Sequence, residues 1–300
     1  MPLVCLPEDD WADHLTIGLT LDVVVWRSGL TLPSTIDTVE FYVPEYLGPP
    51  SIHEVIGRMS SLKVVQTLTA GYEDVLDFVP AGVTLCNARG VHEASTAELA
   101  VALTIASLRG LPGFVHAQRE GVWLHARHDA LADKRVVVIG AGAVGTAIVD
   151  RMAAFEVDVV TVAQNQRAGV AGVTELASLL PGADVVILAV PHTSKTHRMV
   201  DAEFLRLLPD SALVVNVGRG QVVDTEALLA ELVSGRLRAA LDVTDPEPLP
   251  KDHPLWQAPN LLISPHVGGD TSAFLPRAWR LLQSQLDLFA SGEELANVVR

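Results

Sequence analysis

Three polar side chains in the second half of the chain follow short apolar runs of the kind that form buried strands. They are Arg219 after residues 213–217, Glu247 shortly after residues 237–243, and His266 after residues 261–263. An arginine can hold a carboxylate in a bidentate pair, and a histidine can exchange a proton near neutral pH. A glutamate beside that histidine would orient the imidazole and favour its charged form. The three residues are therefore candidate catalytic groups acting on a small anionic substrate, with Arg219 also binding that substrate.

A glycine-rich segment supplies the second chemical signal. The apolar run Val136–Ile139 precedes Gly140, Gly142 and Gly145, which have G-x-G-x-x-G spacing, and a helical pattern follows. In such a motif the glycines permit a tight turn, close approach of a pyrophosphate and tight packing of the helix on the strand. The backbone N–H groups at the start of the helix then bind the phosphates. We therefore expect a dinucleotide to bind here, at Gly140, Gly142, Ala143, Val144 and Gly145; the alternative is a purely structural turn.

The end of the next apolar run indicates which dinucleotide. NAD sites of this type place an acidic residue there to bind the adenosine ribose, but this chain has Ala163, followed by Gln164 and, three residues later, Arg167. Without a carboxylate to repel a 2′-phosphate, and with a guanidinium nearby, NADP(H) is favoured over NAD(H). The alternative is that Arg167 is a solvated loop residue and that the chain discriminates weakly.

Other residues are candidate cofactor contacts, most of them just beyond the expected end of a parallel strand, where ligands bind in such sheets. They are Thr96, Val190, Pro191, Thr196, Val217, Gly218, Asp242 and Gly268. Two of them have competing roles. Thr96 could be the N-cap of a helix as well as a cofactor contact, and Asp242 could position Arg219 or His266 or merely cap a turn.

The elements that must position these residues alternate between strand and helix. From about residue 136 nearly continuous apolar strands are separated by helices, which predicts a doubly wound parallel sheet of the Rossmann type. Within it, Thr174 is predicted to cap a helix at residues 175–180. The first 95 residues alternate more loosely and predict a smaller, flavodoxin-like α/β domain. A long helix from Thr271 to Ser291, interrupted near Pro276, is expected to return the chain to that domain, so the domains are placed at 1–95 with 275–300, and at 96–274.

The composition of the chain limits the classes of partner that it is expected to bind. The chain carries 36 acidic and 21 basic side chains, a net charge of −15, which argues against binding to nucleic acid or to an anionic membrane. Only two cysteines are present, Cys5 and Cys86, with no paired framework, and no leader peptide is evident, so a reducing cytoplasm is expected. No metal site is expected, since His125 and His128 have no third ligand at a suitable spacing.

Taken in order, these motifs resemble those of the D-isomer-specific 2-hydroxyacid dehydrogenases. The matching segments are Gln66–Asp74, Ser95–Glu98, Trp123, Val136–Gly145, Asn216–Gly220, Asp242–Pro248 and Ser264–Gly269. The resemblance implies hydride transfer between NAD(P)H and C2 of a small 2-keto acid such as glyoxylate or hydroxypyruvate. It implies that Arg219, Glu247 and His266 are the catalytic trio.

The resemblance also implies a substrate-carboxylate loop at Ala70, Gly71 and Tyr72, and a homodimer built partly around the helix at residues 96–109. A departure from the family lies at Ala163, where NAD-using members tend to have Asp; this supports NADP. The alternative function is a non-catalytic, dinucleotide-sensing protein similar to the dehydrogenase-like corepressors.

Overall fold

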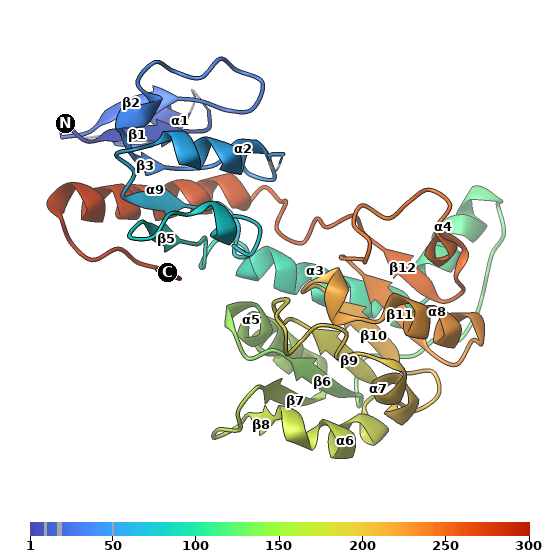
Figure 1. Cartoon of the computed structure of the whole chain (residues 1–300). Coiled ribbons are helices and arrows are strands. Elements are labelled where there is room, and N and C mark those ends of the chain that lie inside the picture. Colours follow the sequence, from blue (N-terminus) through green and yellow to red (C-terminus); the bar gives the residue numbers. More distant parts are fainter. Residues whose placement is uncertain (9–10, 17–19, 50) are drawn as a thin grey trace. The chain divides into compact units, whose positions relative to one another are not determined.

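The computed structural model describes residues 1–8, 11–16, 20–49 and 51–300, which form two compact units (Figure 1). Unit 1 contains residues 1–92 and 272–300, and unit 2 contains residues 93–271. The sequence places the divisions at 95/96 and 274/275. In the structure the first division falls earlier because the helix that opens unit 2 begins at Glu93.

Unit 2 is built on a single parallel sheet with strand order β12-β11-β10-β9-β6-β7-β8. Its strands are β6 (Arg135–Ile139), β7 (Asp158–Ala163), β8 (Ala171–Gly172), β9 (Val185–Leu188), β10 (Leu213–Asn216), β11 (Arg238–Leu241) and β12 (Leu261–Ile263). Taken from the β8 edge, this is the 3-2-1-4-5-6 order of the dinucleotide-binding fold with a seventh strand added. The Rossmann-type prediction is confirmed.

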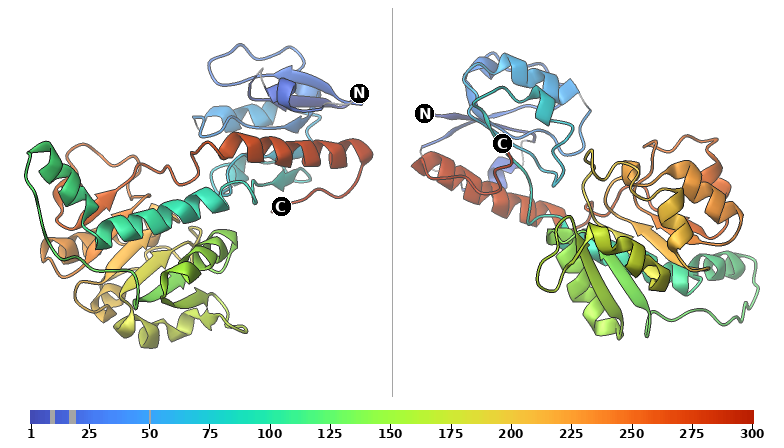
Figure 2. Two further views of the ribbon diagram at one scale, coloured as in Figure 1. Left: turned by 180° about the vertical axis from the view of Figure 1, so that it is seen from behind. Right: turned by 60° about the horizontal axis from the view of Figure 1, so that its bottom comes forward.

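Helices cover both faces of this sheet (Figures 1 and 2). They are α3 (Glu93–Leu108), α4 (Leu111–Arg119), α5 (Ala143–Met152), α6 (Leu176–Leu179), α7 (Ala202–Leu207) and α8 (Thr225–Val233). Alternate residues of each strand point to opposite faces. Val136 and Val138 therefore pack against α3 and α5, whereas Val137 and Ile139 pack against α6, α7 and α8.

Unit 1 holds a second parallel sheet, with order β2-β1-β3-β4-β5, which is the flavodoxin order. Its elements are β1 (Leu3–Leu6), α1 (Trp11–His14), β2 (Asp22–Val25), β3 (Val39–Tyr42), α2 (Ser51–Glu54), β4 (Val64–Gln66), β5 (Thr84–Cys86) and α9 (Phe274–Ser291). One face of the sheet packs on α9 through Phe274, Ala278, Leu282 and Leu286. The other face packs on the segment around Val55 and Ile56.

Three local predictions were wrong. Helix α9 is not interrupted at Pro276, because it begins at Phe274 and its first-turn N–H groups have no helical partner to lose. Thr174 is not an N-cap; it lies inside a 3-10 turn whose capping position is Gly172. Thr96 is not an N-cap either, because α3 begins at Glu93 and places Thr96 within the helix.

Two helices of unit 2, α7 and α8, begin at an aspartate. The side chains of Asp201 and Asp224 accept hydrogen bonds from the backbone N–H groups of Phe204 and Ala227, as N-caps do. Among the described residues, no single helix has the length and apolar character to cross a membrane. The bent pair α3 and α4 meets the test only when taken together, at an angle of 66°.

Candidate active site

The strands of unit 2 end in register. Cα pairing aligns Ile139 with Leu188, Leu188 with Asn216, Asn216 with Leu241, and Leu241 with Ile263. The segments that follow these residues therefore lie side by side along one edge of the sheet. The glycine motif, residues 189–196, residues 217–219, Asp242 and the loop of His266 all start from this edge, which is where ligands bind in such sheets.

The glycine motif forms a tight turn between β6 and α5. Gly140 has a φ of +124°, and a Cβ there would lie 2.3 Å from the carbonyl oxygen of Ala189. A Cβ at Gly145 would overlap the carbonyl oxygen of Gly140, so the helix packs directly on the turn. Gly142 instead faces open space and is the N-cap of α5, so no side chain caps the first N–H groups of the helix. This arrangement fits a dinucleotide pyrophosphate.

The residues that bear on cofactor choice lie beside this turn. Ala163 ends β7, and Gln164 and Arg167 follow it as exposed residues. The Arg167 Nη2 donates to the carbonyl oxygen of Ala141, inside the glycine motif, at 3.2 Å. Arg167 therefore reaches back to the glycine turn, and its positive charge lies beside that turn.

Arg219 lies in a short loop that is held by hydrogen bonds and by close contacts on both sides. The buried Asn216 side chain accepts from the Gly218 N–H at 3.0 Å and donates to the Arg219 carbonyl at 2.9 Å. A Cβ at Gly218 would lie 2.6 Å from the Val190 carbonyl oxygen, and one at Gly220 would overlap that of Thr244. Glycines are required on both sides of Arg219 because the neighbouring loops approach so closely.

Asp242 fixes the loop that carries His266. Its buried carboxylate accepts hydrogen bonds from the Ser264 hydroxyl at 2.6 Å, the Val267 N–H at 3.0 Å and the Gly268 N–H at 2.9 Å. These bonds hold His266 at a φ of +53°, a left-handed conformation that few non-glycine residues adopt. Of the alternatives open for Asp242, its contacts support a cap on the turn that carries His266, which also helps to position that residue.

His266 and Glu247 are hydrogen-bonded, with His266 Nδ1 2.5 Å from Glu247 Oε1. Partial burial of the Glu247 carboxyl raises its pKa. The hydrogen bond and charge of His266 oppose this, with help from a backbone bond to Thr244 and the charge of Arg219, and their sum holds the pKa of Glu247 below its usual 4.5. Glu247 is therefore ionised at neutral pH, and the trio lies in one electrostatic cluster.

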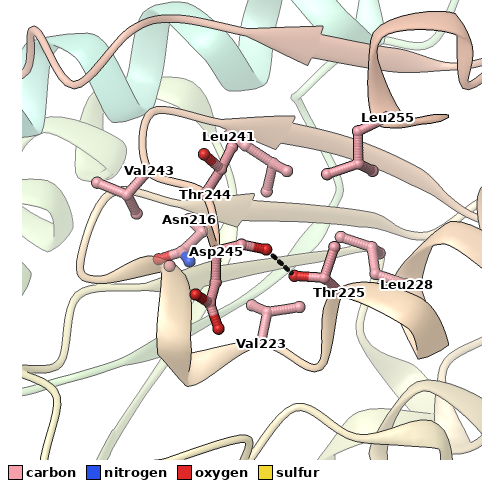
Figure 3. A pocket seen from close by; sticks show the side chains of 10 residues that line it. Asn216, Val223, Thr225, Leu228, Leu241, Val243, Thr244, Asp245 and Leu255 are labelled. Atoms are coloured by element: carbon pink, nitrogen blue, oxygen red, sulfur yellow. Dashed lines mark hydrogen bonds between the residues drawn. The ribbon is translucent and has the colours of Figure 1, made fainter. Parts of the chain in front are cut away.

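The loop that carries Glu247 is anchored to helix α8. The Thr225 hydroxyl donates to the carbonyl oxygen of Asp245 at 2.7 Å, as Figure 3 shows. A small pocket lies beside this bond, lined largely by apolar side chains that include Val223, Leu228 and Leu255. The pocket is a packing gap under the Glu247 loop rather than a place for a polar substrate.

The other predicted cofactor residues also lie at this edge. Thr96 and Asp242 meet at Gly268, where an added Cβ would lie 2.9 Å from Asp242 Oδ2 and 3.3 Å from Thr96 Cγ2. Val190 contacts the glycine turn at Gly140, and Val217 and Gly218 follow β10. Thr196 folds back so that its hydroxyl donates to the Pro191 carbonyl at 2.6 Å.

The predicted substrate loop belongs to unit 1. Ala70, Gly71 and Tyr72 follow β4, and each is partly exposed. The Tyr72 N–H donates to Glu73 Oε2 at 3.0 Å. A backbone amide of this loop is therefore already engaged by a carboxylate oxygen, although that carboxylate belongs to the chain itself.

Sequence reasoning missed several residues that hold the loops of unit 2 and of unit 1 in place. Asn216 and Ser264 are examples, and Gln66 and Asn87 in unit 1 are others. The signal that could have found them is an amide or hydroxyl side chain at the end of an apolar strand. Such a side chain has to satisfy backbone groups where the sheet ends.

Comparison with known proteins agrees with this geometry. Residues 101–268 match the family model of the D-isomer specific 2-hydroxyacid dehydrogenase NAD binding domain. A glyoxylate reductase of Thermofilum pendens is 31% identical over 255 residues, covering 80% of this chain and 75% of that protein. A D-3-phosphoglycerate dehydrogenase of Methanocaldococcus jannaschii is 32% identical, and the match covers 84% of this chain but 50% of that protein.

Among solved structures, a D-isomer specific 2-hydroxyacid dehydrogenase from Xanthobacter autotrophicus Py2, in complex with NADPH and MES, has a TM-score of 0.82. It is 30% identical, with coverage of 100% of this chain and 98% of that one. The fold and site define an oxidoreductase with a dinucleotide-binding domain. The chain belongs to the D-isomer-specific 2-hydroxyacid dehydrogenase family.

Proposed function

We propose that this protein reduces a small 2-keto acid of the glyoxylate or hydroxypyruvate type at C2, with NADPH as the preferred reductant. The observation that carries the proposal is the His266–Glu247 pair beside Arg219, on the same sheet edge as the glycine turn. An acid–base pair and a guanidinium together match the needs of a keto acid, which must gain a proton while its carboxylate is held.

In the proposed reaction NADPH, held at the glycine turn, would supply the hydride that C2 gains and would leave as NADP⁺. His266 donates a proton to the carbonyl oxygen, so that the C=O group becomes a CH–OH group. Glu247 keeps the imidazole oriented through Nδ1, which leaves Nε2 for the substrate. Asp242 holds the His266 loop in place.

The substrate carboxylate is proposed to bind Arg219 and the backbone N–H groups of the loop at Ala70, Gly71 and Tyr72. The bond that the Tyr72 N–H donates to Glu73 Oε2 supports this role, because a carboxylate oxygen is the kind of acceptor that an amide of this loop takes. Small substrates are favoured by the likeness to relatives named as glyoxylate reductases.

The preference for NADPH rests on two features of the segment after β7. Ala163 removes the carboxylate that would repel a 2′-phosphate, and Arg167 is held over the glycine turn by its bond to Ala141. The same proposal places the pyrophosphate on Gly142, Ala143 and Val144. The solved relative with NADPH bound supports this choice.

We also propose a homodimer. Helix α3 is largely buried within its own unit, but the segment that follows it exposes large apolar side chains. They are Leu111, Val115, Val122, Trp123 and Leu124, exposed by 44 to 95%. An apolar patch of this kind suits contact with a second copy. The buried free thiols of Cys5 and Cys86 support a reducing, cytoplasmic location.

The test of the proposal is the change in nicotinamide absorbance with purified protein, NADPH or NADH, and a panel of 2-keto acids. Turnover of glyoxylate or hydroxypyruvate with higher kcat/KM for NADPH is expected. Cofactor binding without turnover of any 2-keto acid would contradict it and favour the sensor function. That alternative has no support among the relatives compared, which are named as reductases and dehydrogenases.

A further inference from the structure

A chain of side-chain amides crosses the interior of unit 1, from helix α9 to the loop at residues 70–72. Gln285 Nε2 donates to Gln66 Oε1 at 2.6 Å. Gln66 Nε2 donates to the carbonyl oxygen of Asn87 at 3.1 Å and to that of Thr67 at 2.9 Å. Asn87 Nδ2 then donates to the carbonyl oxygen of Ala70 at 2.8 Å.

These amides are buried where apolar side chains would be expected. Gln66 and Gln285 are 0% exposed and Asn87 is 7% exposed, and the neighbouring core is apolar. Burying an amide costs free energy unless its hydrogen bonds are made. Here they are made to one another and to backbone groups, and hydrogen bonds fix distance and direction in a way that apolar contacts do not.

At its other end, the chain of side-chain amides is hydrogen-bonded to the C-terminal segment through Gln285. Gln285 accepts from the Ala296 N–H and donates to the Ala296 carbonyl, each at 2.9 Å. Beyond Ala296, Val298 pairs antiparallel with Cys86 at the edge of β5. The amide chain thus starts from a rigid anchor, with α9 on one side and the sheet on the other.

At the end of the amide chain nearest the loop at residues 70–72, Asn87 sets the direction of a backbone amide. In a trans peptide the C=O and N–H groups point in opposite directions. Because Asn87 holds the Ala70 carbonyl, the Gly71 N–H of the same peptide must point away from Asn87 and the core. The next peptide is held at both ends, because the Thr69 hydroxyl donates to the Gly71 carbonyl at 2.6 Å and the Tyr72 N–H donates to Glu73 Oε2 at 3.0 Å.

We infer that Asn87, supported by Gln66 and Gln285, is a positioning residue that directs the Gly71 N–H toward the substrate carboxylate. The inference rests on the proposed function, in which the amides of this loop bind that carboxylate. It assigns to three buried amides and the C-terminal segment a part in substrate affinity, although none of them touches the substrate.

The test compares wild type with Asn87→Leu, which has nearly the same shape as asparagine but cannot donate to Ala70, and with Gln285→Met. Steady-state kinetics with glyoxylate and NADPH give KM and kcat, and fluorescence titration gives the NADPH Kd. We expect KM to rise about tenfold in Asn87→Leu and about threefold in Gln285→Met, in line with the loss of about one hydrogen bond. The kcat and the NADPH Kd should stay within about twofold of wild type, since the trio and the glycine turn lie in unit 2.

A matched control, Gln283, lies two residues before Gln285 on the same helix. Gln283 accepts from the Thr16 N–H at 2.7 Å and donates to the Thr16 carbonyl at 3.2 Å, the same two-bond clamp, but it leads away from the loop. Gln283→Met should therefore leave KM unchanged. A rise in KM equal to that of Gln285→Met would overturn the inference by reducing it to general destabilisation.

The remaining outcomes separate this inference from the proposed function. If wild type turns over no 2-keto acid, the proposed function fails and the inference loses its basis. If wild type is active and Asn87→Leu is folded with unchanged KM, the inference alone is overturned. If Asn87→Leu does not fold, Gln285→Met decides, and an unchanged KM there has the same meaning.

Discussion

At the scale of single residues, the contact between His266 and Glu247 determines what the site can do. The imidazole is 41% exposed in its side chain, so a substrate can reach it, while the carboxylate holds Nδ1. Arg219 adds a positive charge to the same cluster and helps to keep Glu247 ionised. The pair thus has the orientation that the proposed proton donor needs, and Arg219 supplies the charge proposed to bind a carboxylate.

Replacement of His266 tests its role as proton donor. His266→Asn is the suitable variant, because asparagine tolerates the left-handed conformation that the loop imposes at φ +53°. Loss of a general acid typically lowers kcat by about 10²- to 10⁴-fold. The measurement is steady-state kcat for 2-keto acid reduction, with the NADPH Kd as the control that should not change. A kcat within threefold of wild type would remove His266 from the mechanism.

Glu247 gives a pH-dependent prediction. Its pKa in the folded protein lies below the usual 4.5, so the ionised carboxylate stabilises the fold. This stabilisation is fully present above pH 4.5. The stabilisation is lost as the pH falls through the lowered pKa. The free energies of unfolding of wild type and Glu247→Gln, measured in urea, should therefore differ by a constant amount above pH 4.5. This difference should shrink as the pH falls below 4.5. A difference that grows on acidification would contradict this sign.

At the scale of elements, the site is a set of loops that hold each other. The glycine turn approaches residues 189–190, residues 218–220 approach Val190 and Thr244, and Asp242 ties together residues 264–268. Each loop follows a strand whose last residue is in register with its neighbours. Positions at the strand ends are therefore set by the sheet, and the loops need to add only short-range contacts.

The loop after β7 gives a prediction on cofactor choice. Arg167→Ala removes the guanidinium held over the glycine turn and should raise KM for NADPH about tenfold or more, the usual loss for a hydrogen bond to a charged group. KM for NADH should change little, since NADH has no 2′-phosphate. Arg206→Ala, which removes an exposed arginine on α7, is the matched control. Equal effects on both cofactors would mean that Arg167 has a structural role.

At the scale of the whole molecule, the proposed homodimer can be tested through the patch after α3. Val115→Asp and Trp123→Glu together place two charges on a surface where Val115 is 52% and Trp123 is 95% exposed. The variant should sediment as a monomer in analytical ultracentrifugation while wild type sediments as a dimer, because burying an unpaired charge is costly. Val233→Asp on α8, at a residue 66% exposed, should have no effect. A monomeric wild type would refute the proposal.

The sequence by itself determined the elements and the candidate groups. The strands, the glycine motif, the N-caps Asp201 and Asp224, and the order of Arg219, Glu247 and His266 all leave local signals, because each depends on residues within one turn or one strand. Parallel strands then bring their carboxyl ends to one edge, so convergence of the trio could be predicted without coordinates.

Only the tertiary structure decided which partners those groups have. Asp242 had several possible roles until its bonds to residues 264–268 were seen, and Thr96 was expected at a helix start that lies three residues earlier. The Gln285–Gln66 bond joins residues 219 apart in the chain. No periodicity or spacing in the sequence indicates a contact of that range, because it forms only once the chain has folded and brings α9 against the sheet of unit 1.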